Sequence, residues 1–74
     1  MSKLPVLSGK DVIKALKELG YEVDHQTGSH VILRNVNPPN RRLTIPNHKP
    51  VAKGTLRAII RQAGLSREAF LNLL

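Results

Sequence analysis

An alternating stretch that follows a glycine turn constrains the fold of this chain more than any other feature. Along residues 29–35 apolar Val31 and Leu33 fall on one face, and His30, Ile32 and Arg34 fall on the other. This alternation is typical of a half-buried β-strand. The pattern places a histidine on the polar face, directly after Gly28 and Ser29, at the start of a rigid element. A general acid or base is presented in this way, although an ordinary surface histidine fits the same pattern.

Cap and turn residues divide the rest of the chain. Ser8 and Asp11 have the spacing of a helix capping box, and Gly20 suits the end of that helix. We expect Thr55 to cap a second helix that ends at Gly64. Ser66 is expected to cap a last short turn that offers Phe70, Leu73 and Leu74 to the core. The expected strands are Tyr21–Gln26, Ser29–Asn35 and Arg41–Ile45.

The resulting order, α-β-β-β-α-α, predicts an α+β fold in one domain, residues 1–74. A three-stranded antiparallel sheet with helices packed on one face satisfies this order with short connections. The other face then stays open and carries His30, Arg34, Arg42 and Thr44. In the first expected strand His25 lies two residues after Val23, and residues two apart share a face of a strand. We therefore expect His25 on the same face as Val23, partly buried or at an edge of the sheet.

A strong positive charge indicates the class of partner. Twelve Lys and Arg against five Asp and Glu give a net charge of +7. Such an excess in a small domain favours a polyanion, most often nucleic acid. A solubilising surface and an acidic protein partner are the alternatives. With two aromatic residues, Tyr21 and Phe70, contacts from cations and backbone amides to phosphates are favoured over base stacking.

Several other classes of function are disfavoured. The chain has no cysteine, so we expect neither disulfides nor thiolate metal sites. The five acids are scattered, and we predict no metal and no cofactor. No membrane span or signal peptide is evident, and a cytoplasmic location is expected. A Ser-His-Asp hydrolase is disfavoured because Ser29 and His30 point to opposite faces of a strand.

Metal-free RNA cleavage needs no component that this chain lacks. A base removes the ribose 2′-hydroxyl proton, the oxygen attacks the adjacent phosphate, and an acid protonates the leaving 5′ oxygen. Imidazole suits either proton transfer near neutral pH, and lysine or arginine steadies the developing charge.

An ordered set of short motifs resembles the HicA family, the ribonuclease toxins of bacterial toxin–antitoxin pairs. The set comprises Ser8-Gly9-Lys10-Asp11-Val12, Leu19-Gly20-Tyr21, Gly28-Ser29-His30, residues 43–49, Gly54-Thr55-Leu56, residues 59–66, Glu68 and Phe70. The resemblance implies a fold like that of double-stranded-RNA-binding domains (dsRBD-like), metal-independent cleavage of mRNA, and inhibition by a HicB antitoxin. It also implies that His30 is the catalytic histidine.

The predicted RNA contacts combine this resemblance with the charge pattern. They are Gly28, Ser29, Arg34, Arg42, His48, Lys49 and Lys53. For His48 a phosphate-binding or structural role is favoured over a second catalytic group. Two other functions stay open: a non-catalytic RNA-binding module, and a DNA-binding helix-turn-helix over residues 55–74.

Overall fold

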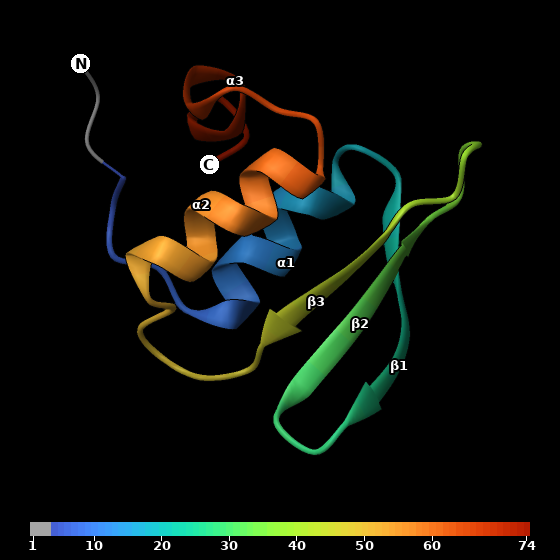
Figure 1. The fold of residues 1–74 in the computed structure, drawn as a ribbon, viewed down its shortest axis with the longest axis horizontal. Coiled ribbons are helices and arrows are strands. Elements are labelled where there is room, and N and C mark those ends of the chain that lie inside the picture. The colour runs from blue at the N-terminus through green and yellow to red at the C-terminus, as the bar shows by residue number, and fades with distance from the viewer. Residues whose placement is uncertain (1–3) are drawn as a thin grey trace.

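The fold is a helix, a three-stranded antiparallel sheet and two further helices (Figure 1). A computed structural model describes residues 4–74. Its elements are α1 (Gly9–Lys17), β1 (Tyr21–Thr27), β2 (His30–Asn35), β3 (Arg42–Pro46), α2 (Lys53–Gln62) and α3 (Arg67–Leu71). The predicted α+β class and element order are confirmed, and the arrangement is that expected of a dsRBD-like fold.

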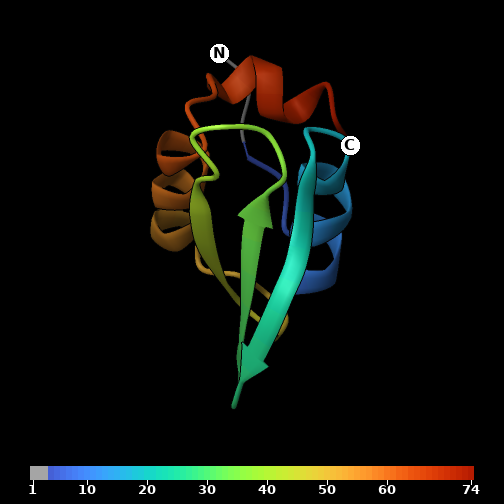
Figure 2. The same ribbon diagram turned by 90° about the vertical axis from the view of Figure 1, so that its right-hand side faces the viewer.

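The helices cover one face of the sheet and leave the other open. α1 and α2 lie behind the sheet in Figure 2, and no helix crosses its front. α3 lies at one end of the molecule, and the β1–β2 turn projects at the other. The core between the layers is entirely apolar and includes the fully buried Val12, Leu16, Leu33, Leu43, Ile45, Leu56 and Phe70. The inward residues predicted for β2 and β3 are therefore confirmed.

Two details at the C-terminal side differ from the sequence prediction. α2 begins at Lys53 rather than after Thr55, and its N-cap residue, Ala52, makes no side-chain capping bond. The preceding Val51 is buried and donates its N–H to the Leu7 carbonyl oxygen at 2.8 Å. This anchored residue fixes where the chain turns into the helix, without a polar cap. The second difference is Leu74, which is 54% exposed and not part of the core.

A bulge in β1 changes the face on which His25 lies. Val23 pairs with Leu33 and His25 pairs with Ile32, so Asp24 is an extra residue between them. An extra residue reverses the alternation for the rest of a strand. The prediction that His25 shares a face with Val23 is therefore wrong. His25 lies exposed on the open face.

Gly9 brings α1 into backbone contact with the end of β3. Its N–H donates to the His48 carbonyl oxygen at 3.0 Å. A Cβ atom at this position would collide with the carbonyl oxygen of Pro46 and would lie 3.1 Å from the Cα atom of Asn47. Only glycine permits this approach, because both neighbouring atoms belong to the main chain.

We expect Gly9→Ala to destabilise the protein by about 1–3 kcal/mol, the usual range for overpacking a tight contact. Gly54→Ala is the matched control, because a Cβ atom at Gly54 meets nothing within 4 Å. Alanine in a helix is favoured over glycine by about 0.5–1 kcal/mol, so this variant should be at least as stable as the wild type. Denaturant unfolding measures both, and equal effects would contradict the role assigned to Gly9.

Candidate active site

His30 lies at the projecting end of the sheet, where β2 leaves its turn. Gly28 has φ +56°, a conformation that other residues rarely adopt. His30 itself pairs with Thr27 of β1 and Pro46 of β3, so its backbone is held on both sides. Its side chain is exposed and forms no hydrogen bond or ion pair with any residue from 4 to 74. The position is thus rigid, and the imidazole is free to meet a ligand.

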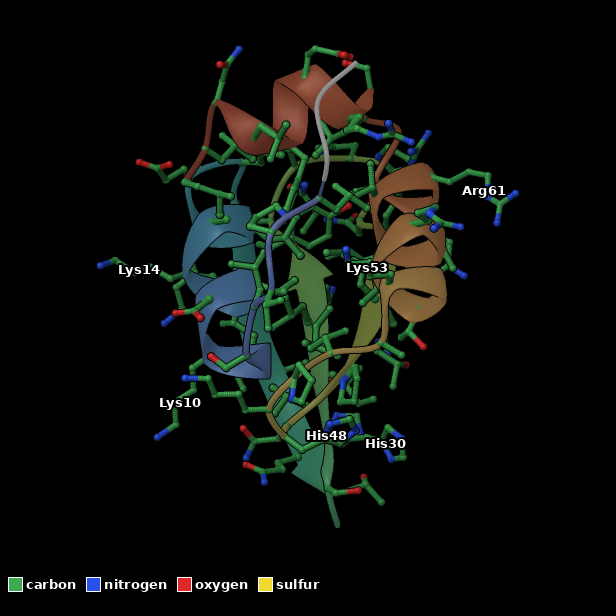
Figure 3. All side chains as sticks on the ribbon, turned by 90° about the vertical axis from the view of Figure 1, so that its left-hand side faces the viewer. Lys10, Lys14, His30, His48, Lys53 and Arg61 are labelled. Carbon is green, nitrogen blue, oxygen red and sulfur yellow. The ribbon has the colours of Figure 1, made fainter. Side chains whose placement is uncertain are left out.

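The loop between β3 and α2 is tied to this end of the sheet by its backbone. The Asn47 N–H donates to the Ser29 carbonyl oxygen at 2.6 Å, and the His48 carbonyl oxygen accepts from Gly9. These bonds join the loop to the starts of β2 and α1. They bring His48 to the same end of the molecule as His30, as Figure 3 shows.

The ring of His48 is oriented by its own loop. Its Nδ1 lies 3.2 Å from the Pro50 carbonyl oxygen. A carbonyl oxygen only accepts, so Nδ1 carries the proton in this contact. In the neutral ring the lone pair is then on Nε2. His48 therefore presents Nε2, rather than Nδ1, to a ligand.

The charge of Lys49 acts on Asp11, the acidic residue of the α1 capping box. Ser8 and Asp11 exchange hydrogen bonds of 3.0 and 3.1 Å. The pKa of Asp11 is lowered by these bonds, first from the Ser8 backbone and then from its hydroxyl, and further by the charges of Lys49 and Lys14. Lys49 therefore lies close to a carboxylate as well as beside His48.

Arg34 and Arg42 lie on the open face, as predicted, but not beside His30. They face each other across β2 and β3, four residues from His30, which is about 13 Å along a strand. Across the open face the register forms three rows: Glu22–Arg34–Arg42, His25–Ile32–Thr44 and Thr27–His30–Pro46. The predicted arginine contacts are thus at the opposite end of the sheet from the histidine.

Asp24, the bulged residue, offsets the charge of these arginines. His25 Nδ1 donates to Asp24 Oδ2 at 2.8 Å, and Arg42 Nη1 lies 3.9 Å from the same oxygen. The pKa of Asp24 is lowered mainly by the bond from His25, and also by the charges of Arg42, His25 and Arg34. The sequence prediction missed this cluster, since no local signal marks the bulge that creates it.

The structure therefore divides the predicted site residues into three groups. Gly28, Ser29, His48 and Lys49 lie at the His30 end, whereas Arg34 and Arg42 lie at the far end of the sheet. Lys53 is the exposed first residue of α2, on the helical side of the molecule (Figure 3). Gly9 was not predicted as part of the site. A glycine directly after the Ser8 cap was its only signal.

Within residues 4–74, no three His, Cys, Asp or Glu side chains come together in a way that could hold a metal ion. No helix in the same part of the chain is long and apolar enough to cross a membrane.

The sequence matches the profile of one protein family over residues 9–65, described as "HicA toxin of bacterial toxin-antitoxin". The chain belongs to the HicA family. The matched segment contains α1, the whole sheet and α2, and with them His30, His48 and Lys49. HicA toxins pair with an antitoxin, so this protein is the toxin component of such a system. A comparison with curated proteins found no significant match.

Replacing Ser8 by Ala keeps the backbone N–H that lowers the pKa of Asp11 most and removes only the hydroxyl, so the pKa should rise part of the way toward its ordinary value of 3.8. The folded-state pKa of Asp11 is depressed, so its contribution to stability is present above pH 3.8 and is lost as pH falls through the folded value. Loss of a serine cap costs about 1 kcal/mol. NMR titration of the Asp11 carboxyl group measures the shift.

Ser66→Ala is the matched control, because Ser66 caps α3 by accepting from the Ala69 N–H at 3.1 Å. It should lower stability without moving the pKa of Asp11. A Ser8→Ala protein with unchanged stability would contradict the capping assignment.

Proposed function

We propose that this toxin is a metal-independent endoribonuclease that cleaves mRNA in the cytoplasm, with His30 as its general acid or base. The observation that carries the proposal is the position of His30. The side chain is exposed, makes no contact that would occupy it within residues 4–74, and stands on a backbone paired on both sides. The HicA family assignment supports the same reading.

In the proposed reaction a base takes the proton of a ribose 2′-hydroxyl group. The 2′ oxygen then forms a bond to the adjacent phosphorus, and the bond from phosphorus to the 5′ oxygen breaks. The leaving oxygen receives a proton. The products are a 2′,3′-cyclic phosphate and a 5′-hydroxyl end. His30 performs one of the two proton transfers, for which imidazole is suited near neutral pH.

The neighbouring residues hold the phosphate in this proposal. Lys49 supplies positive charge near the phosphorus, where negative charge develops. His48, with its ring set by Pro50, binds a phosphate oxygen when its Nε2 is protonated. The Gly28–Ser29 turn allows the RNA backbone to come close to His30. No cluster of carboxylates is required.

A non-catalytic RNA-binding module is the second candidate. It uses the same positive charge and the same open end of the sheet. It gives no reason for an unpartnered histidine on a rigid strand. The two functions are distinguished by whether the protein cleaves RNA, and by whether replacing His30 alone abolishes that cleavage.

His30→Ala should reduce RNA cleavage by about 10²–10⁴-fold, the usual effect of losing a proton-transfer group. The fold should be intact, because the exposed side chain makes no hydrogen bond or ion pair with residues 4–74. Cleavage of an unstructured RNA is followed on gels in the presence of EDTA, and the fragment ends are analysed. We expect 2′,3′-cyclic phosphate or 3′-phosphate ends.

His25→Ala is the matched control, since His25 is an exposed histidine on the same face whose ring is already bonded to Asp24. It should cleave at a rate close to that of the wild type. A folded His30→Ala protein of wild-type activity would rule out the assignment. Strict dependence on Mg²⁺ with 3′-hydroxyl ends would rule out the mechanism.

We further propose that the antitoxin is of the HicB class and inhibits by covering His30. The His30 end of the sheet projects beyond the helices (Figures 1 and 2) and is open to a partner. An acidic partner would associate rapidly with a toxin of this charge. If it buries Arg34 or Arg42 it must also pair them, because an unpaired buried charge is strongly unfavourable.

Co-expression with the neighbouring open reading frame should yield a complex that neither binds nor cleaves RNA. Proteolytic removal of the antitoxin should restore cleavage, which shows that the toxin in the complex is intact. A complex that cleaves at the full rate would contradict inhibition by occlusion.

A further inference from the structure

The positive charge of this protein is concentrated on its helices rather than on its sheet. The strands carry two arginines, Arg34 and Arg42, against two acids, Glu22 and Asp24. The helices carry Lys10, Lys14, Lys17, Lys53, Arg57, Arg61 and Arg67 against Asp11 and Glu68. The open face of the sheet is therefore nearly balanced in charge, and the net positive charge lies mainly on the helical side.

α2 presents a row of cations without a compensating acid. Lys53, Arg57 and Arg61 recur every four residues, and the helix has no Asp or Glu. Residues four apart share a helix face and are separated by about 6 Å along its axis. Within residues 4–74, none of the three forms an ion pair. Like charges at this spacing disfavour a helix. Arg61, in the last turn, favours the helix dipole, but Lys53 and Arg57 are not explained by the stability of α2.

A shallow groove lies beside this row. Its lining includes Gly54, Arg57, Arg61 and Arg67, with Ile60 and Leu65 as part of its apolar surface. The groove is thus rimmed by arginines contributed by α2 and α3.

Gly54 leaves open space on the wall of this groove. A Cβ atom at this position would meet nothing within 4 Å, so packing does not require glycine. Glycine also weakens a helix relative to alanine. A glycine on the wall of a groove lets the backbone of a bound molecule approach closely.

The row continues from the His30 end of the molecule. α2 begins a few residues after the loop that carries His48 and Lys49. In Figure 3, Lys53 lies near the middle of the view, above His48 and His30, and Arg61 projects from the outer side of α2, farther from His30. On α1, by contrast, Asp11 lies between Lys10 and Lys14, and its pKa is lowered by Lys14 and Lys49. The positive charge of α2 is therefore less compensated by acidic residues than that of α1.

We propose that α2 is the binding track for the RNA strand that leads away from His30, with Lys53, Arg57 and Arg61 each contacting a phosphate. This inference rests on the proposed function, since it assumes that RNA is bound at His30. It moves the main electrostatic contacts from the open face of the sheet to the flank of α2, and it adds two arginines to the RNA-binding residues.

The test measures binding of a fluorescent unstructured 20-nucleotide RNA as a function of salt concentration, in a His30→Ala background where no RNA is cleaved. Arg57→Gln with Arg61→Gln should weaken binding and flatten the slope of log K against log salt by about 1.4, since each lost phosphate contact on a single strand contributes about 0.7. The double variant should fold, because both side chains are exposed.

Lys14→Gln with Lys17→Gln is the matched control, because it removes the same two charges from exposed positions on α1. It should leave the slope close to that of the His30→Ala parent. A slope unchanged by the α2 substitutions, or changed equally by the α1 substitutions, would overturn the track. A larger change from Arg34→Gln with Arg42→Gln would also overturn it, in favour of the sheet face.

Binding of the antitoxin is measured with the same variants. If the α2 substitutions leave RNA binding intact but weaken binding of the co-expressed antitoxin, the groove binds an acidic protein segment and the RNA track is wrong. Because binding is measured without cleavage, failure of the proposed ribonuclease activity does not affect this result. A protein that binds RNA along α2 but never cleaves it would support the binding track and contradict the proposed ribonuclease activity.

Discussion

The backbone contact between Gly9 and the end of β3 is the constraint on which the site depends. The N–H group of Gly9 binds the His48 carbonyl oxygen, and Asn47 binds Ser29 on the other side of the loop. Main-chain hydrogen bonds therefore tie the loop to the first residue of α1 and to the residue just before β2. The buried side chain of Val51 anchors the far end of the loop, whereas His48 and Lys49 are exposed and can meet a ligand.

The same contact connects the helix cap to the chemistry. Ser8 and Asp11 fix the first turn of α1, and that turn holds the loop that carries His48 and Lys49. The charge of Lys49 in turn favours the ionised form of Asp11. The helix cap, the placement of the loop and the charge of Lys49 are thus linked, although these residues lie up to 41 positions apart in the sequence.

Much of the fold could be predicted because its signals are local. The alternation in β2 and β3 fixes which side chains enter the core, and Ser8 and Ser66 cap the helices they were expected to cap. The start of α2 was mispredicted because it depends on Val51, which is anchored by a contact with Leu7. The face of His25 was mispredicted because a bulge depends on pairing between strands, which a single strand does not reveal.

The sequence by itself determined the order of the elements, the apolar core, the exposed position of His30 and the net charge of +7, because each follows from residue type and local spacing. Only the tertiary structure decided where that charge acts. It brought Asp24 to Arg42 through the bulge and left Lys53, Arg57 and Arg61 without an acidic partner within residues 4–74. The physical reason is that electrostatic energy depends on distances in space, and strand register and helix packing set those distances.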